Sequence, residues 1–259
     1  MLDFISAVPA PRAICENTAS LINTPNGNGE TSLHLSARYG YVNLTEQMVV
    51  SGANVSIQNK DGDAAIHVAM KYNNTQTVIV LMKNKDSLTA VNKEGQTALF
   101  NAVANNSYYW TKVLVENGAD PKVKRKDGIT VIYLAAFQEN VQIVKYLIDQ
   151  GVDVNVLTDR GVSLLEVALN SKNQQLIELL INRGANPDRA LSNGHNALHL
   201  AVLQRNVSLI QLLINKGVDV KAKDAKGNNA LQLAINEGYP EIAILLLSAI
   251  DAKCHSATP

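Results

Sequence analysis

The sequence is poor in aromatic residues and in cysteine. Phe, Trp and Tyr together make up 5% of its 259 residues, and its two cysteines, Cys15 and Cys254, lie near opposite ends of the chain. Two cysteines exclude a disulfide-rich scaffold and fit a reducing compartment. So few aromatic side chains favour a core of Ala, Leu, Ile and Val, which suits closely packed helices.

The chain also lacks an excess of charge and a long apolar run. Its 23 basic and 23 acidic residues cancel, so no net field attracts nucleic acid or an anionic membrane. No apolar segment approaches the roughly 18 residues of a membrane span, and the N-terminus has no basic leader. We therefore predict a cytoplasmic protein with no nucleic-acid partner and no membrane span. Export signals that a receptor reads stay open.

The motifs that usually carry chemistry are also missing. The sequence contains no Gly-rich phosphate loop, nucleophile elbow or CxxC pair, and its carboxylates fall mainly on expected loops and outer helix faces, where solvation explains charge. We therefore predict that the protein is not an enzyme and carries no cofactor. A catalytic pair assembled only in space would escape this reasoning.

What the chain does have is a strict repeat. Glycine recurs every 33 residues, at Gly29, Gly62, Gly95, Gly128, Gly161, Gly194 and Gly227. A period of this length indicates one supersecondary unit stacked on copies of itself. Such stacking builds an extended surface, which is better suited to binding than to catalysis.

Aligned on these glycines, the units predict a first helix with a regular core face. A residue that can cap a helix N-terminus recurs as Thr31, Thr97, Thr130, Ser163, Asn196 and Asn229, with Ala64 as the exception. An apolar anchor follows two positions later, at Leu33, Ile66, Leu99, Ile132, Leu165, Leu198 and Leu231. Three positions further on, Ser36 and six alanines (Ala69, Ala102, Ala135, Ala168, Ala201 and Ala234) let neighbouring helices approach closely.

A second helix is predicted from recurring apolar pairs, such as Leu114 and Val115 in the third unit. It ends at Gly52, Gly118, Gly151, Gly184 and Gly217, which suit a left-handed helix stop. Lys85 replaces this glycine in the second unit. Either Asn84 or a changed turn absorbs the substitution, or the stack kinks between the second and third units.

This helix–turn–helix–hairpin unit resembles the ankyrin repeat. The likeness is carried by GETSLHLSARYGYVNLTEQMVVSGAN in the first unit, GHNALHLAV in the sixth, and NGAD at 117–120. The family's Thr-Pro-Leu-His signature occurs as TSLH, AAIH, TALF, TVIY, SLLE, NALH and NALQ, without its proline and with its histidine only at His34, His67 and His199. The resemblance covers residues 24–250. It implies an all-α fold, an ankyrin-repeat α-solenoid of seven units with right-handed stacking.

The ends of the array need shielding from solvent. We predict that residues 1–23 form an N-terminal capping segment, with a helix over 13–22, and that residues 251–259 form a C-terminal tail. The last helix carries Ile244 where most other units have a polar residue. Either the tail covers it, or another chain does, for example through self-association, or the protein once continued.

Two local motifs have a structural and a functional interpretation. His195 and His199 have the spacing of helical metal ligands, but Asn196 stands where a zincin-type motif needs Glu. The resemblance also implies that His199 hydrogen-bonds within the repeat turn, so we predict no metal site. The basic run at 121–126 could serve nuclear import or phosphate binding. A solvated hairpin is the favoured interpretation.

The resemblance implies that a partner protein binds through the hairpin tips and the inner helices of the concave face. The predicted tip residues are Lys60, Asp61, Lys93, Glu94, Lys126, Asp127, Asp159 and Arg160. Beyond the repeat glycines lie Asp63 and Ile129, in the same register as Glu30. The ends of the first helices add Arg38, Tyr39, Lys71, Tyr72, Asn105, Phe137, Gln138 and Leu203.

Binding energy concentrates in aromatic and apolar anchors ringed by polar groups. We therefore predict a hot spot at Phe137 and Ile129, beside Tyr72 and Asn105. Packing between adjacent repeats is the alternative role of each of these side chains. Elsewhere, Trp110 aligns with core positions and is predicted to be buried, whereas the neighbouring Tyr109 should be exposed on the back.

The predicted function is a non-catalytic protein–protein interaction module. Two alternatives stay open. The chain could be a regulatory or targeting subunit that positions or blocks an enzyme. It could also be a microbial effector, delivered into a host cell to bind host proteins, as its Asn- and Lys-rich composition allows.

Overall fold

Each repeat forms an inner helix, an outer helix and a hairpin loop. The computed structural model describes residues 21–256, with side chains as far as residue 250. The inner helices are α2 (Ser32–Tyr39), α4 (Ala65–Lys71), α7 (Ala98–Ala104), α9 (Val131–Phe137), α11 (Leu164–Ser171), α13 (Ala197–Leu203) and α15 (Ala230–Asn236). The outer helices are α3 (Val42–Val50), α5 (Thr75–Met82), α8 (Tyr108–Glu116), α10 (Val141–Asp149), α12 (Gln174–Asn182), α14 (Val207–Asn215) and α16 (Pro240–Ser256).

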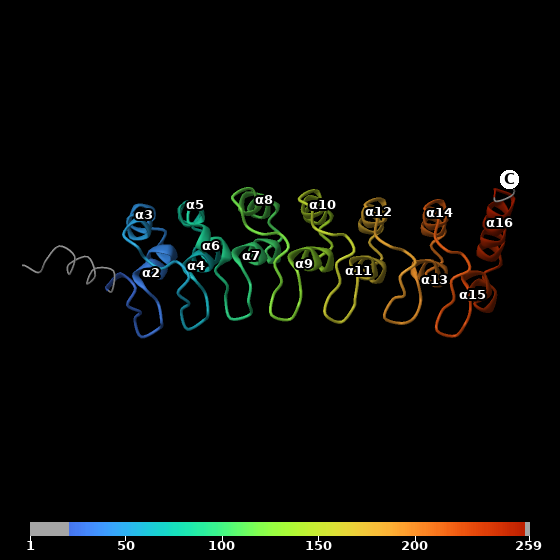
Figure 1. Cartoon of the computed structure of the whole chain (residues 1–259), viewed down its shortest axis with the longest axis horizontal. Helices are drawn as coiled ribbons and strands as arrows, with labels where there is room; N and C mark the ends of the chain where they lie inside the picture. The colour runs from blue at the N-terminus through green and yellow to red at the C-terminus, as the bar shows by residue number, and fades with distance from the viewer. Residues whose placement is uncertain (1–20, 257–259) are drawn as a thin grey trace, which may run out of the picture. The chain divides into compact units, whose positions relative to one another are not determined.

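The repeats fall into two compact units. The first unit ends at Asp127 and contains the three repeats from α2 to α8, and the second begins at Gly128 and contains the four from α9 to α16. Within each unit the inner helices form one layer and the outer helices a second, and the hairpins extend beyond the inner layer (Figure 1). Over the described residues, strand-like pairing is limited to isolated bridges, such as the one between Leu157 and Ser163. The predicted all-α repeat fold is confirmed.

The core follows the 33-residue register. The apolar anchors of the first six inner helices are at most 2% exposed, and the small residues three positions later at most 1%. Leu231, the anchor of the last repeat, is half-buried. On the outer helices, the first members of the apolar pairs from Leu81 to Leu246 are likewise buried. Burial of one apolar stripe per helix therefore stabilises each repeat against its neighbours.

The repeat glycines are needed for two reasons, which Gly62 illustrates. Its φ of +86° lies in the left-handed region that side chains with a Cβ rarely adopt. A Cβ there would also lie 2.8 Å from the backbone nitrogen of Lys93, in the next hairpin. Glycine thus permits both the turn and the close approach of the following tip.

Lys85 does not occupy a strained turn. It begins a short additional helix, α6 (Lys85–Thr89), whose N-terminus is capped by the Asn84 side chain accepting a hydrogen bond from the Asp86 backbone N–H at 3.0 Å. Helix α6 packs against α4, α5 and α7. The interpretation that Asn84 and a changed turn absorb the substitution is therefore confirmed.

The prediction of a buried Trp110 is wrong. Its side chain is half-exposed, whereas Ile143 and Leu176, at the same register position, are fully buried. An indole is too large for the space that an aliphatic side chain fills, and tryptophan is seldom fully buried. Tyr109 is 58% exposed, as predicted, and its ring contacts Trp110 edge-on at 5.2 Å between centroids.

The predicted N-terminal cap and C-terminal tail have different outcomes. Most of the predicted capping segment, including residues 13–20 of its helix, lies outside the described residues. At the other end, α16 continues without a break through Ser256. Residues 251–256 therefore extend the last helix instead of folding back over it. Ile244 is 68% exposed.

Candidate protein-binding surface

Three inner helices each carry one buried histidine, which links the helix to the next hairpin. In each ring, Nδ1 accepts a hydrogen bond from the backbone N–H that begins the same helix, and Nε2 donates to a carbonyl of the following repeat. The residue pairs for Nδ1 are His34 with Thr31, His67 with Ala64, and His199 with Asn196, at 3.1, 3.3 and 3.3 Å. The carbonyls that accept from Nε2 belong to Asp63, Gln96 and Asn228, at 2.9, 2.9 and 3.0 Å.

This geometry defines the chemistry of the three rings. In His34 and His67, a carbonyl facing Nε2 and an N–H facing Nδ1 place the single proton on Nε2. In His199, Nδ1 also lies 2.6 Å from the Asn196 side-chain oxygen. Burial lowers the pKa of all three imidazoles, so the neutral form is favoured. Because both nitrogens of His199 are occupied, this ring has no lone pair free for a metal. The sequence resemblance indicated the bond within the turn but not the bond to the next repeat.

Other residue types replace histidine in the same register. The Tyr133 hydroxyl donates to the Ser163 carbonyl at 3.4 Å, and the Glu166 carboxylate accepts from the Ser192 backbone N–H at 2.9 Å. Phe100 fills the same position with a fully buried apolar ring. The link between repeats therefore survives changes of side chain, and in Glu166 the direction of donation is reversed.

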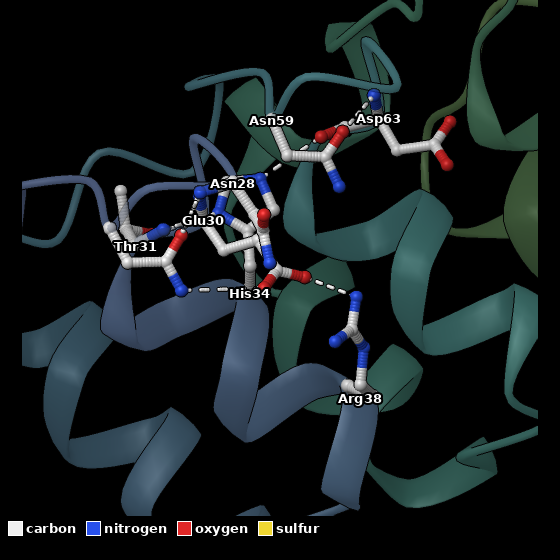
Figure 2. A network of polar contacts seen from close by, with 8 residues as sticks. Asn28, Glu30, Thr31, His34, Arg38, Asn59 and Asp63 are labelled. Atoms are coloured by element: carbon white, nitrogen blue, oxygen red, sulfur yellow. Dashed lines mark hydrogen bonds and ion pairs between the residues drawn. The ribbon is translucent and has the colours of Figure 1, made fainter.

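Glu30 and Arg38 form an internal pair at the start of the array. The Glu30 side chain is 3% exposed and forms an ion pair with the Arg38 guanidinium, which also lies 5.5 Å from the centre of the Tyr72 ring. Figure 2 shows this pair between the first two hairpins, with the Asp63 carboxylate pointing away from it. Arg38 therefore orients Tyr72 and Glu30, while Asp63 is left to face another part of the surface.

That surface contains a polar cavity of about 330 Å³ between α4 and α7. Three predicted binding residues line it, namely Asp63, Lys71 and Asn105, together with Asn101, which the sequence did not single out. Among the ion pairs of the described residues, neither the Asp63 carboxylate nor the Lys71 ammonium takes part. The cavity thus presents one acid, one base and carboxamides to a ligand.

Exposed aromatic rings lie on the same helix layer. Tyr39 is 62% and Tyr72 49% exposed, and the ring of Tyr39 stacks on that of Tyr41 at 5.8 Å. In the second unit Phe137 is 74% exposed. Ile129, Gln138 and Leu203, also predicted to bind, are half-buried. The predicted hot spot combines residues of both units and stays a prediction.

The hairpin tips of the first unit are linked to one another by lysines. The Lys93 ammonium donates to the Lys60 carbonyl, and the Lys126 ammonium donates to the Lys93 carbonyl at 2.6 Å. These lysines and the acidic residues that follow them (Asp61, Glu94 and Asp127) are exposed, as are Asp159 and Arg160 in the second unit. The tips are therefore accessible, but two of their cations already have partners.

The basic run at 121–126 is only partly free. Arg125 forms an ion pair with Asp127, and Lys122 and Lys124 are exposed. The import and phosphate-binding hypotheses for this run stay predictions. In the part of the chain that the structure describes, no three His, Cys, Asp or Glu residues are grouped so that they could hold a metal ion. Nor does any helix there combine the length and apolar character needed to cross a bilayer.

Comparison with known proteins agrees with this geometry. The family model described as "Ankyrin repeats (3 copies)" matches residues 33–125, 111–190 and 170–257. No curated protein matches the sequence.

Two solved structures share the fold. The ankyrin repeat domain of Bcl-3, titled a unique member of the IkappaB protein family, is 24% identical, with a TM-score of 0.70 over 80% of this chain and 95% of that one. The human ASB11 ankyrin repeat domain is also 24% identical, with a TM-score of 0.62 over 84% and 98%. The family match supports a protein–protein interaction module. The chain belongs to the ankyrin-repeat family.

Proposed function

We propose that this chain is a non-catalytic module that holds a partner protein on its inner helices and hairpin tips. The observation that carries the proposal is the cavity between α4 and α7. Asp63, just before α4, and Lys71, its last residue, form no ion pair, and the exposed Tyr72 directly follows Lys71. Nothing in the fold requires charges to line a cavity unpaired, because other repeats bury alanines and leucines without them.

The physical argument rests on complementarity. A partner segment that supplies a cation to Asp63 and an anion or carbonyl to Lys71 would form charge-assisted hydrogen bonds. Tyr72 would add the aromatic contact area that dominates most interfaces. Arg38 supports this role because its guanidinium lies over the Tyr72 ring, 5.5 Å from the centroid. The buried histidines are engaged in linking repeats, which argues against their use as general bases.

The test is affinity capture from the native lysate with the full chain as bait. The variant Lys71→Glu/Tyr72→Ala should weaken capture of the partner at least about 30-fold, because hot-spot substitutions cost about 2 kcal/mol or more. The matched control is Lys112→Glu/Tyr109→Ala, which changes the same residue types on the outer helix α8. It should bind like the wild type. Equal binding by the Lys71/Tyr72 variant contradicts the proposal.

A second variant tests the tip and the second unit. Lys126→Glu/Phe137→Ala should abolish binding while the helical circular dichroism spectrum stays unchanged. Retained binding by this variant removes those residues from the surface. The captured partner also separates the finer roles, since an enzyme whose turnover changes on adding this chain indicates a regulatory subunit. A host-cell protein as partner indicates an effector.

A further inference from the structure

Two departures from the repeat pattern meet on the outer helices of the first unit. Val50 is 82% exposed, and the six later repeats have a polar residue at its position: Lys83, Glu116, Asp149, Asn182, Asn215 and Ser248. Lys85 stands where other repeats end the outer helix with glycine, and it begins α6. The fold does not require Val50, because the same helix end forms with a polar residue in the other repeats.

Both residues line one groove. A cavity of about 420 Å³ lies between α3 and α5, with Val49, Val50 and Val80 as its apolar side chains. Its polar lining residues are Glu46, Lys83, Asn84 and Lys85. Its size falls in the range of about 300–1,000 Å³ that is typical of ligand pockets. The inner-helix cavity shares no lining residue with it.

The rim of this groove carries an uncompensated cation. The Lys83 ammonium pairs with the Glu46 carboxylate at 2.9 Å, which neutralises both. Among the described residues, Lys85 takes part in no ion pair. The carboxylate of Asp86 lies in the first turn of α6, where the helix dipole stabilises a negative charge. An apolar groove with a free ammonium at its edge is complementary to an aliphatic side chain beside a carboxylate.

We propose that this groove docks a short segment of a second partner protein, in which aliphatic side chains lie next to acidic ones. The aliphatic side chains cover the exposed Val50 and the half-buried Val49, beside the already buried Val80, and the acid pairs with Lys85. Lysine at this edge also discriminates against basic segments, because like charges repel. The module therefore holds one protein on its inner helices and another on its outer helices.

The experiment uses the full ¹⁵N-labelled chain and two synthetic helical peptides as probes. Both peptides carry leucines at i and i+4, flanked by glutamates in one and by lysines in the other. The glutamate peptide should shift the amide signals of Val50, Val80 and Lys85. The lysine peptide should bind at least about tenfold more weakly, the equivalent of 1.4 kcal/mol.

Variants then test the groove residues. Val50→Asn introduces the residue that two other repeats carry there, and Lys85→Glu reverses the rim charge. Each should weaken glutamate-peptide binding at least about tenfold with an unchanged thermal midpoint. The control Val207→Asn changes an exposed valine on the outer helix α14 and should bind normally. The Lys71→Glu/Tyr72→Ala variant should also bind this peptide normally, so failure here is separate from failure of the inner-helix proposal.

Three outcomes overturn the proposal. The first is equal binding of the two peptides, or amide shifts centred on Tyr72 instead of Val50. The second is a change at the Val50 and Val80 amides in a Phe4→Ser/Ile5→Ser full chain without peptide, which would assign the groove to the chain's own N-terminal segment. The third is sedimentation as a dimer that Val50→Asn converts to a monomer, which would assign it to a second copy.

Discussion

The two units are built from the same repeat, yet they present different surfaces. Both bury apolar anchors in the same register, apart from the half-buried Leu231, and a small residue three positions later. The first unit adds a cavity with unpaired charges, an extra helix in place of a glycine turn, and an exposed Val50 beside a groove. The second unit keeps its glycine turns and exposes Phe137 and Ile244. The buried residues that recur every 33 positions serve folding, whereas the two units differ in the exposed residues between them.

The links between repeats show a second contrast. The first unit uses His34 and His67, which hydrogen-bond to both neighbouring segments. The second unit uses Tyr133 and Glu166 as well as a histidine. The position tolerates any side chain that satisfies the next repeat's backbone or fills the space.

The largest loss of stability should come from Gly62→Ala, with Gly227→Ala as its control. The two glycines differ in how closely the next hairpin approaches them. Gly62→Ala places a Cβ 2.8 Å from the Lys93 backbone nitrogen, whereas a Cβ at Gly227 meets nothing within 4 Å. Both residues have a left-handed φ, which costs about 1–2 kcal/mol for alanine, and the clash adds about 1–3 kcal/mol. Urea unfolding should show Gly62→Ala to be the more destabilised. Equal losses would show that the turn alone requires glycine.

A loss of about 2–3 kcal/mol is expected for His67→Ala in the first unit. The substitution leaves a cavity and strands the Ala64 N–H and the Gln96 carbonyl, to which the ring is bonded. Gln232 occupies the same register in the last repeat but is exposed, so Gln232→Ala should cost about 0.5 kcal/mol or less. Thermal unfolding of the two variants compares them directly. Similar losses of stability in the two variants would contradict the view that only the buried side chain links one repeat to the next.

Stability should fall on acidification below about pH 6.5, the usual pKa of histidine. Burial lowers the folded-state pKa of His34 and His67, so the unfolded chain binds protons at a higher pH than the folded chain. The stabilisation is complete above pH 6.5 and is lost as pH falls toward the lowered pKa. His67→Phe, which copies the buried Phe100, should flatten the change in thermal midpoint between pH 6.5 and 5. An unchanged slope would exclude His67 as a source.

The smallest effects are expected where the pattern is interrupted at the surface. Val50→Asn in the first unit and Phe137→Ala in the second should each change the free energy of unfolding by about 0.5 kcal/mol or less. Both side chains are mostly exposed, at 82% and 74%. Urea unfolding checks this. A large loss in either variant would show that the residue serves folding and would weaken its assignment to binding.

Much of the site could be located from the sequence because register fixes the layer on which a residue lies. Register and the resemblance to the ankyrin repeat together placed Tyr39, Tyr72 and Phe137 at the ends of the first helices, and all three are exposed in the structure. Their role in binding stays a prediction. Glu30, in the register of Asp63 and Ile129, is buried and pairs with Arg38. A one-dimensional pattern contains no information on such a pairing between side chains eight residues apart.

The second hydrogen bond of each histidine, the cavity between α4 and α7 and the groove beside Val50 could not be derived from the sequence. Each depends on atoms of two successive repeats, and the distance between them is set by packing. Asn101 was missed for the same reason, since its own repeat gives no sign of the cavity that it helps to line.

The sequence by itself determined the repeat, the two-helix unit, the buried stripe and the glycine positions. These follow from periodicity, because every copy must bury the same face and turn at the same place. Only the tertiary structure decided which polar side chains form ion pairs within the protein and which form none. Lys85 became the start of a helix, Arg38 an internal partner, and Asp63 and Lys71 an unpaired acid and base in one cavity. Which side chains pair depends on the distances between atoms of neighbouring repeats. Packing sets these distances, and sequence spacing does not.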